Sequence, residues 1–459
     1  MKILFYNWTP LNVQNQGGGV AVYLKKMMKY LSMHNYDVDI YFLSSGYFYD
    51  SKKRVHIVKE ESEFAHSYII INSPIIAPLG NVPYKDFQKI ICDNEIVTIF
   101  DRFIKEYGPF DVIHFHSFEG LSPNVLSLKE KYRNTKFIHS MHDYGCFCPN
   151  VKFWTLADTN CVSITNKNCY KCNKGALGLP FYARIKFRQQ ISVYEKLFYR
   201  ILNRMMIVFS NIRSKDSCIK RSLIYQKYRD LCVTRLNKYI DAELSVSRTV
   251  KEIALSYGVN EQKTHVCYIG TEAAETFCRQ SSSLFDGKTL EIIYLGYVTK
   301  AKGTFLLLDA LESMDTLLAN NIIIKFACKI QDKSVFNRIV NLRSKFKDVI
   351  VYDGYTHADY PRIFKGVNLG IVPPLWEDNL PQVALEMIGN GIPVITSNHG
   401  GAKELNSHPD FCFKDVPDLI NKIRKIYKNP MLLNEYWQYA TDLTTMKKHI
   451  EQLFHYYTL

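Results

Sequence analysis

Short runs rich in β-branched and aromatic residues alternate with amphipathic stretches along most of the 459-residue chain. The first half contains the strand-like runs KILFYNW, DVDIYFLS, DVIHFHS and KFIHSMHD. The second half repeats the pattern with LEIIYLGYV, NIIIKFAC, VIVYDGY, NLGIVPP and IPVITSN. Buried strands that alternate with helices form parallel sheets with helices on both faces. The sequence therefore predicts an α/β fold with two doubly wound, Rossmann-like domains.

Two breaks in this pattern suggest how the chain is divided. A Cys-rich loop and long basic helices interrupt the alternation at about 144–240, and the aperiodic, Ser-rich stretch 271–288 has the composition of a linker. We expect an N-terminal domain at 1–270 that includes the insertion, and a C-terminal domain at 289–430. The helical end of the chain, 431–459, is expected to cross back to the N-terminal domain. Ligands of such sheets bind outside the carboxyl ends of the strands, here in a central cleft.

The stretch WEDNLPQVALEMIGNGIPVITSNHGGAKEL, residues 376–405, carries the clearest chemical pattern. Pro381 favours a first helical turn and Gly391 suits the residue just after a helix end. Asp378 then lies in the loop before the helix. Glu386 lies within the helix, on the face of Gln382.

Carboxylates at this position can accept hydrogen bonds from the vicinal hydroxyls of a sugar. Gly400 and Gly401 follow the next strand, where they would let backbone N–H groups approach a phosphate. Acceptors for a sugar beside donors for a phosphate suit a nucleotide-sugar. The alternatives are that Asp378 is only a helix N-cap and that Glu386 is a solvated surface residue.

These motifs resemble those of a known family. DNLPQVALEMIGNGIPV followed by GGAKE is similar to the donor-site signature of retaining glycosyltransferases of the GT-B fold, family four, the group 1 glycosyl transferases of bacterial surface-polysaccharide synthesis. Further similar segments are YLGYVTKAKGTFLLLDAL, SVSRTVKEIALSYGV, HVCYIGTE and QGGGVAVYL. The resemblance covers most of the chain and is weakest over 144–240.

The resemblance implies roles for residues of the C-terminal domain. Glu386 would bind the ribose hydroxyls, Asp378 would contact the transferred sugar near the reacting carbon, and Lys302 would neutralise the diphosphate leaving group. Asn379 and Leu380 belong to the same donor-binding motif. Many members have an arginine after the strand glycine. Tyr297 stands there in this chain, and we expect Lys300 to substitute for that arginine.

The N-terminal side of the cleft offers Gly18, Gly19 and His142. The glycines open a helix after the first strand and could cradle a phosphate. The alternatives are a plain flexible loop and a dinucleotide fingerprint, but Gly-x-Gly-x-x-Gly is absent. By resemblance, His142 contacts the donor sugar near the reacting centre, although a lone histidine is more often structural. His114 and His116 alternate on one strand and would point the same way, as core or acceptor-side groups.

Five cysteines lie between Cys146 and Cys172. Cys148, Cys161 and the Cys169-x-x-Cys172 pair could hold a structural zinc ion. There is no second Cys-x-x-Cys, so reduced packing cysteines and redox roles remain as alternatives. The resemblance also implies that catalysis needs no metal, since cationic side chains and helix dipoles take its place in such enzymes.

The chain has a formal net charge of +14, and residues 182–239 hold 14 Lys and Arg against 3 Asp and Glu, a local net of +11 (14 − 3). Basic side chains mixed with apolar ones predict a segment that lies on an anionic membrane surface. The alternatives are a solvated basic face and, without a supporting motif, nucleic-acid binding. With neither a secretory signal nor an apolar run of spanning length, we expect a cytoplasmic protein, peripheral on the inner face of the cytoplasmic membrane.

The sequence as a whole predicts a metal-independent, retaining glycosyltransferase. It would move a sugar from a nucleoside-diphosphate sugar to a glycan or lipid-linked oligosaccharide acceptor. Two alternatives remain: a non-catalytic subunit that binds the nucleotide-sugar, and a sugar-nucleotide epimerase of the same fold.

Overall fold

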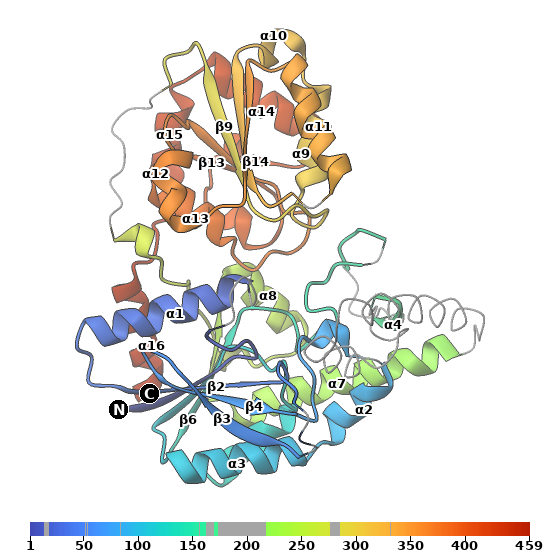
Figure 1. Cartoon of the computed structure of the whole chain (residues 1–459), viewed down its shortest axis with the longest axis vertical. Coiled ribbons are helices and arrows are strands. Elements are labelled where there is room, and N and C mark those ends of the chain that lie inside the picture. The colour runs from blue at the N-terminus through green and yellow to red at the C-terminus, as the bar shows by residue number, and fades with distance from the viewer. Residues whose placement is uncertain are drawn as a thin grey trace.

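The computed structural model describes residues 1–12, 18–50, 52, 54–82, 84–155, 157–161, 169–172, 217–275, 285–330 and 332–459. Two lobes stand one above the other, each built around its own sheet (Figure 1). Residues 276–284 of the predicted linker and much of the basic segment 182–239 lie outside the described residues. The predicted domain limits at 270, 289 and 430 stay predictions.

The N-terminal sheet has the strand order β3-β4-β2-β1-β5-β6-β7-β8. All its described pairings are parallel except that of β3 with β4. The buried aromatic residues Phe5, Phe42, Phe100 and Phe115 fill the space between sheet and helices. The strands are β1 Lys2–Tyr6, β2 Asp39–Ser45, β3 His56–Glu60, β4 His66–Ile71, β5 Val112–Phe115, β6 Lys136–Met141, β7 Ala242–Ser245 and β8 Thr264–Val266.

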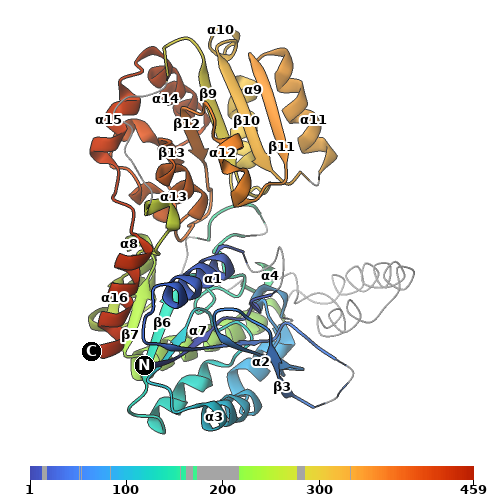
Figure 2. The same ribbon diagram turned by 60° about the vertical axis from the view of Figure 1, so that its left-hand side comes forward.

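Helices cover both faces of this sheet, as the alternating pattern predicts (Figures 1 and 2). The stretch PNVLSLKE, which reads as a helix in the sequence, is the 3-10 helix η2, Pro123–Glu130. The helices of this lobe are α1 Gly18–Met33, α2 Tyr84–Cys92, α3 Glu95–Tyr107, α4 Cys169–Cys172, α7 Ser217–Tyr239 and α8 Arg248–Ser256.

The C-terminal sheet is parallel throughout, in the order β11-β10-β9-β12-β13-β14. Its strands are β9 Leu290–Leu295, β10 Ile322–Cys328, β11 Asp348–Asp353, β12 Leu369–Val372, β13 Val394–Ser397 and β14 Cys412–Phe413. Its helices are α9 Thr304–Ser313, α10 Thr316–Ala319, α11 Lys333–Asn341, α12 Tyr360–Ile363, α13 Gln382–Gly389, α14 Val416–Lys428 and α15 Leu432–Tyr439. The two sheets together confirm the predicted pair of doubly wound units.

The last helix, α16 (Met446–Thr458), lies in the lower lobe beside α1, far from the helices that precede it (Figures 1 and 2). Its Tyr457 hydroxyl lies 2.7 Å from Nδ1 of the buried His114, and Nε2 of its His449 lies 2.5 Å from the Tyr23 hydroxyl. The C-terminal end of the chain thus packs into the N-terminal core.

The Glu404 carboxylate joins the two lobes. Glu404 ends the 3-10 helix η8, Gly400–Glu404, and its oxygens accept hydrogen bonds from the backbone N–H groups of Arg248 and Thr249 at 2.9 and 2.7 Å. The hydroxyls of Thr249 and Tyr268 donate to the same carboxylate at 2.8 and 2.7 Å. Glu404 therefore satisfies N–H groups at the start of α8, where a negative charge also suits the helix dipole.

The cysteine segment 146–161 packs into the N-terminal lobe. Cys146 and Cys148 are buried, and burial raises the pKa of Cys148 to about 12. The Arg229 guanidinium donates to the Cys169 sulfur at 3.5 Å. Over the described parts of the chain, no three His, Cys, Asp or Glu side chains are placed to hold a metal ion. The zinc hypothesis for Cys148, Cys161, Cys169 and Cys172 is therefore not supported.

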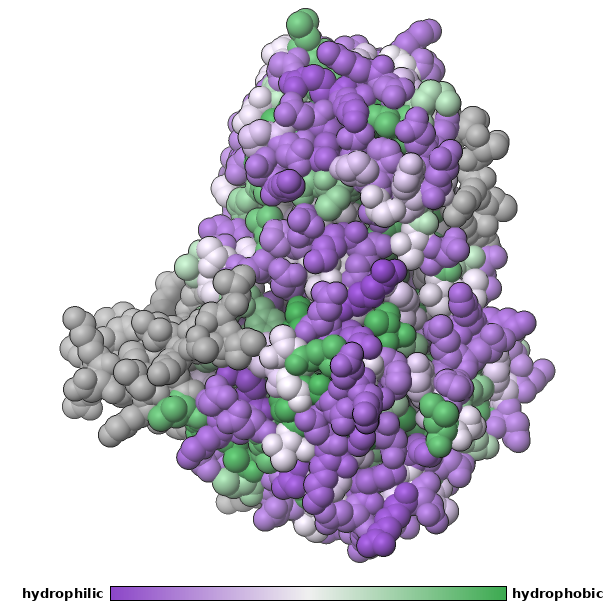
Figure 3. Space-filling view, turned by 180° about the vertical axis from the view of Figure 1, so that it is seen from behind, coloured by the Kyte–Doolittle hydropathy of each residue, from purple (hydrophilic) through white to green (hydrophobic). Residues whose placement is uncertain are grey.

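None of the helices in the described part of the chain combines the length and the apolar character needed to cross a bilayer. Figure 3 shows the face opposite to that of Figure 1, where hydrophobic residues form small groups and several lie close to the meeting of the two lobes.

We expect Glu404→Ala to lower the free energy of unfolding by about 2 kcal/mol, because it leaves several donors at the start of α8 without their charged acceptor. Glu404→Gln keeps one acceptor oxygen and should lose about half as much. Urea unfolding followed by circular dichroism measures both. The exposed Glu63→Ala is the control and should stay within about 0.5 kcal/mol of wild type. An equally small effect for Glu404→Ala would contradict this role.

Candidate functional site

Asp378 lies at the carboxyl end of the C-terminal sheet, in the loop between β12 and α13. Its side chain is 8% exposed and its Oδ2 lies 2.6 Å from Nζ of Lys302, which also lies 5.2 Å from the centre of the Trp376 ring. Gly303 follows Lys302 in the left-handed region, with φ 74°, and a Cβ there would overlap the carbonyl oxygen of Pro373. The Lys-Gly pair of the sequence thus brings a cation against the Asp378 carboxylate.

Gly400 and Gly401 lie directly against the Asp378 loop. The Gly400 N–H donates to Oε2 of Glu377 at 2.8 Å, and the Gly401 N–H donates to the carbonyl oxygen of Asp378 at 2.7 Å. A Cβ at either glycine would overlap backbone atoms of Glu377, Asp378 or Asn379. Both N–H groups are thus used within the protein, and the two glycines allow a close backbone contact that fixes Asp378. Their predicted contact with the donor stays a prediction.

Glu386 lies within α13, which starts after Pro381 and is followed by Asn390 and by Gly391 at φ 77°, as predicted. Its carboxylate is 12% exposed. Oε1 lies 2.8 Å from Nε2 of His357, and Oε2 accepts a hydrogen bond of 2.5 Å from the Tyr360 hydroxyl. Burial, followed by the Glu386 charge, raises the pKa of Tyr360, so that phenol stays a donor. Glu386 is therefore a fixed acceptor rather than a freely solvated residue.

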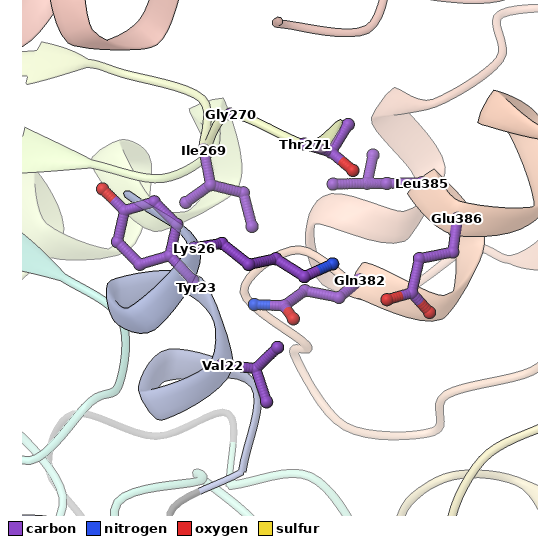
Figure 4. Close-up of a pocket in the computed structure, with 9 residues that line it drawn as sticks. All are labelled: Val22, Tyr23, Lys26, Ile269, Gly270, Thr271, Gln382, Leu385 and Glu386. Atoms are coloured by element: carbon purple, nitrogen blue, oxygen red, sulfur yellow. The ribbon is translucent and has the colours of Figure 1, made fainter. Parts of the chain in front are cut away.

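Glu386 also lines a pocket between the two lobes (Figure 4). The walls come from α1, from α13 and from the residues before the linker: Val22, Tyr23, Lys26, Ile269, Gly270, Thr271, Gln382, Leu385 and Glu386. Lys26 extends across this pocket toward α13 (Figure 4), and its Nζ lies 3.2 Å from Oε2 of Glu272. One predicted carboxylate thus faces a cavity closed by the N-terminal lobe.

Gly18 and Gly19 begin α1, and both are exposed. Gly18 has φ 60°, and a Cβ on it would have no other atom within 4 Å, whereas a Cβ on Gly19 would meet the Gln382 side chain at 2.8 Å. The Gln382 amide donates to the Gly19 carbonyl oxygen at 2.9 Å. The predicted N-terminal glycine loop therefore meets the start of the donor-site helix.

His142 follows β6 and is half-buried on the N-terminal side. Its Nε2 lies 3.0 Å from Nδ1 of the buried His116, and its ring centre lies 5.3 Å from that of Tyr23. Burial, followed by the charges of neighbouring histidines, lowers the pKa of His142 to about 3. The imidazole is therefore neutral near pH 7.

His114 and His116 do point the same way, with ring centres 4.0 Å apart. His114 is a core residue, because its two nitrogens lie 2.7 Å from the Tyr457 hydroxyl and 2.8 Å from the Ser140 hydroxyl. His116 instead holds the ring of His142. The Tyr144 hydroxyl in the same segment is buried without a hydrogen-bond partner in the described structure, and burial, followed by the charges of Glu377 and Asp378, raises its pKa.

Lys300 does not join the cluster around Asp378. Its Nζ lies 2.7 Å from Oδ2 of Asp158, and both side chains are exposed. Tyr297, at the position of the missing arginine, is 64% exposed. Lys300 is thus paired with an acidic residue of the N-terminal lobe, and its substitution for the arginine stays a prediction.

Several buried polar atoms at the meeting of the lobes have no hydrogen-bond partner in the described structure: Trp376 Nε1, Asn379 Nδ2 and Asn160 Oδ1. Leu380, next to Asn379, is buried with the core. Buried polar groups are nearly always hydrogen-bonded, so these atoms have room for a partner such as an ordered water or a ligand.

Sequence reasoning missed four residues of this region: Glu377, His357, Tyr360 and Asn160. Glu377 precedes Asp378 in the sequence, and only the structure shows that its carboxylate accepts a hydrogen bond from the Gly400 N–H. His357 and Tyr360 follow β11 by a few residues. Their position after a strand, at the sheet edge where ligands bind, is the feature of the sequence that could have indicated them. Asn160 donates to Oε1 of Glu377 at 3.3 Å from the other lobe, and no spacing in the sequence indicates that contact.

Comparison of the fold with solved structures gives matches along the whole chain. Sucrose-phosphate synthase from Thermosynechococcus elongatus has a TM-score of 0.57 at 16% identity, covering 100% of this chain and 98% of that one. The trehalose-phosphate synthase from Burkholderia xenovorans, in complex with glucose-6-phosphate, has a TM-score of 0.59 at 11% identity, with 99% of each chain covered. Alr3699/HepE from Anabaena, in complex with UDP, has a TM-score of 0.58 at 13% identity, with 99% of each chain covered. These likenesses show the GT-B fold.

The sequence itself is similar to a family over the C-terminal lobe. No curated protein sequence matches the chain well enough to count as a relative. Residues 277–443 match the family described as "Glycosyl transferases group 1", and this range contains Lys302, Asp378, Glu386 and the two glycines. The chain therefore has the GT-B fold, and its residues 277–443 are similar to the group 1 glycosyl transferases.

Proposed function

We propose that this protein is a glycosyltransferase that moves a sugar from a nucleoside-diphosphate sugar to a hydroxyl of a glycan. The observation that carries the proposal is the arrangement around Asp378, where one lysine, two carboxylates and unpaired buried polar atoms lie at the carboxyl end of a sheet, inside the range that is similar to the group 1 glycosyl transferases. Solved structures of the same fold contain UDP or glucose-6-phosphate, which supports this substrate class.

In the reaction, the bond between the sugar C1 and the diphosphate oxygen breaks, an acceptor hydroxyl oxygen forms the new bond to C1, and its proton passes to the departing nucleoside diphosphate. Negative charge develops on the departing diphosphate, so a cation beside it lowers the barrier. Lys302 supplies that cation, and the Lys302–Asp378 ion pair keeps it in place before the donor binds. Asp378 keeps a second carboxylate oxygen to accept a sugar hydroxyl, and the neutral His142 contributes a hydrogen bond from the opposite side.

Glu386 binds the two ribose hydroxyls in this proposal. His357 and Tyr360 hold its carboxylate through one contact to each oxygen, and the remaining lone pairs can accept from a diol. We also propose retention of the anomeric configuration, without a metal ion in catalysis, as the resemblance to family four implies. Lys302 then supplies the positive charge that a divalent cation supplies in metal-dependent enzymes.

Glu386→Ala should weaken nucleoside-diphosphate binding by about 100-fold, because the ribose loses a charged acceptor that makes two hydrogen bonds of about 1.5 kcal/mol each. Glu386→Gln should lie between wild type and alanine. Isothermal titration calorimetry with UDP, GDP, ADP and dTDP identifies the base and measures the loss. The matched control is Tyr360→Phe, which removes one of the groups that hold the carboxylate but leaves the carboxylate itself. Equal affinity of Glu386→Ala and wild type would contradict the ribose role.

Asp378→Asn should lower turnover by at least about 100-fold while changing donor affinity less than about threefold, because the carboxylate acts near the reacting carbon. Release of free nucleoside diphosphate measures turnover, and proton NMR of the product reports the anomeric configuration. A chelator such as EDTA should leave turnover unchanged. Donor turnover that yields an epimerised sugar would instead favour the epimerase, and donor binding with no turnover on any glycan would favour the non-catalytic subunit.

The acceptor proposed from the sequence is a glycan on a membrane lipid, with the basic segment 182–239 on an anionic membrane surface. We expect the protein to sediment with vesicles that contain phosphatidylglycerol and to release as salt rises, since each basic residue near such a surface contributes roughly 1 kcal/mol. Replacing Arg184, Lys186, Arg188, Arg200 and Arg204 with Gln should reduce this binding while turnover of a soluble acceptor continues. Equal recovery with neutral phosphatidylcholine vesicles would contradict the membrane proposal.

A further inference from the structure

The ring of His142 is held from two sides. Its Nε2 lies 3.0 Å from Nδ1 of His116, and the two ring centres lie 5.2 Å apart with 29° between the ring planes. The ring centre of Tyr23 lies 5.3 Å from that of His142 and 6.0 Å from that of His116. Tyr23 also lines the pocket between the lobes (Figure 4). His142 therefore lies beside the cleft, in an orientation that two neighbouring rings fix.

Both of these neighbours are anchored in the N-terminal lobe. His116 directly follows β5, its backbone N–H donates to the Tyr6 carbonyl oxygen at 2.8 Å, and the residue is 1% exposed. The His116 ring centre lies 5.8 Å from that of Phe5. The Tyr23 hydroxyl lies 2.5 Å from Nε2 of His449 on α16. The sheet therefore holds one neighbour of His142, and the helix that returns from the end of the chain holds the other.

Nε2 of His116 is buried and has no hydrogen-bond partner in the described structure. His114, whose ring centre lies 4.0 Å away, does not provide one, because its own nitrogens meet the hydroxyls of Tyr457 and Ser140. Burial, followed by the charges of neighbouring histidines, lowers the pKa of His116, so its ring is neutral. A neutral imidazole carries its hydrogen on one nitrogen only. The unpaired Nε2 of His116 therefore holds either an N–H or a lone pair.

The lone pair is the better choice for this unpaired nitrogen. Buried N–H groups without an acceptor are rare, whereas acceptors with an unused lone pair are less so. His116 then carries its hydrogen on Nδ1 and donates it to Nε2 of His142. Because His142 is also neutral, its own hydrogen lies on Nδ1.

Nδ1 of His142 is open to a ligand. It has no hydrogen-bond partner among the described residues, and it does not belong to the buried unpaired atoms, so solvent reaches it. The residue is half-buried at the carboxyl end of β6, where ligands of such sheets bind. An N–H group thus faces the solvent on the N-terminal side of the cleft.

We propose that His116 is a positioning residue that holds His142 in the tautomer with its hydrogen on Nδ1, so that His142 donates a hydrogen bond to an oxygen of the transferred sugar. This inference rests on the proposed function and adds the donating atom and the direction of the bond. An Nδ1 that already carries a hydrogen cannot take the proton of the acceptor hydroxyl. His142 is therefore a donor and not a general base, and His116 acts through it without touching the substrate.

The tautomer is measured without substrate, by nitrogen NMR of protein with isotope-labelled histidines, and the His142 signal is identified by its loss in His142→Ala. Wild-type protein should show the Nδ1–H form. His116→Asn places an amide N–H near the position of Nδ1 and should retain that form. His116→Leu removes the donor, and the signal should move toward the Nε2–H form, which free histidine favours in water.

The kinetic test separates turnover from donor binding. Turnover is the release of nucleoside diphosphate from UDP-glucose, GDP-mannose, ADP-glucose and dTDP-glucose, and calorimetry with UDP, GDP, ADP and dTDP measures affinity. His116→Leu should lower kcat about tenfold and change diphosphate affinity less than about twofold, because the misdirected N–H serves the sugar and not the nucleotide. His116→Asn should keep about half of the wild-type kcat or more. His116→Gln reaches the unpaired Nε2 position instead and should resemble His116→Leu.

The matched control is Tyr457→Phe, which removes a hydroxyl from the same buried cluster at His114 and should leave the His142 tautomer and kcat as in wild type. A hydrogen on Nε2 of His142 in wild-type protein would overturn the inference, as would one tautomer shared by wild type and His116→Leu. Equal losses of kcat and diphosphate affinity in His116→Leu and His116→Asn would assign His116 a structural role.

If His116→Leu does not fold, wild type, His116→Asn and His116→Gln decide the question, and the same tautomer in all three would overturn the inference. The expected tautomers in a protein that binds none of the four diphosphates would contradict the proposed function and not the positioning of His142 by His116.

Discussion

The contact between the Gly400–Gly401 turn and the loop Glu377–Asn379 determines how the rest of this molecule is arranged. The turn donates two backbone N–H groups to that loop, one to the Glu377 carboxylate and one to the Asp378 carbonyl oxygen. On its other side, the Gly400 carbonyl oxygen accepts from the Thr249 hydroxyl of the N-terminal lobe at 3.1 Å. Because neither glycine has space for a Cβ, the position of Asp378 and the approach of the lobes depend on the same two residues.

The electrostatics of the cleft follow from this packing. A carboxylate as buried as Asp378 is costly unless a cation lies beside it, and Lys302 provides that cation at 2.6 Å. A donor diphosphate would compete with Asp378 for Lys302, which frees carboxylate oxygens for sugar hydroxyls as the phosphate takes the lysine. In the proposed mechanism, donor binding and the release of Asp378 from Lys302 would thus be one event. A fixed arginine at position 297 would not require this coupling.

At the junction, side chains of each lobe make polar contacts with groups of the other lobe. Glu404 of the C-terminal lobe satisfies the start of α8, and Asn160 of the N-terminal lobe contacts Glu377. The Gln382 amide meets Gly19, and α16 returns to the N-terminal core through Tyr457 and His449. Polar contacts of this kind can be broken and remade at low cost, in contrast to a large apolar interface. Such a junction suits an enzyme whose substrates enter between the lobes.

The sequence by itself determined the fold class and the C-terminal half of the candidate site. Strand and helix periods are local properties, and the spacing of Asp378, Glu386, Gly391 and Gly400 depends on one strand–helix–strand unit, so both could be predicted without tertiary contacts. The strands β3, β4 and β14 were not predicted: β3 (HIVKE) has no buried residue, β4 (HSYIII) is a short run without alternation, and β14 (CF) has only two residues. The tertiary structure alone decided which groups meet across long separations: Asn160 with Glu377, Lys300 with Asp158, and Glu404 with α8. It also leaves the zinc hypothesis without support among the described residues, because thiol spacing shows which cysteines are near in sequence but not whether their sulfur atoms can share an ion.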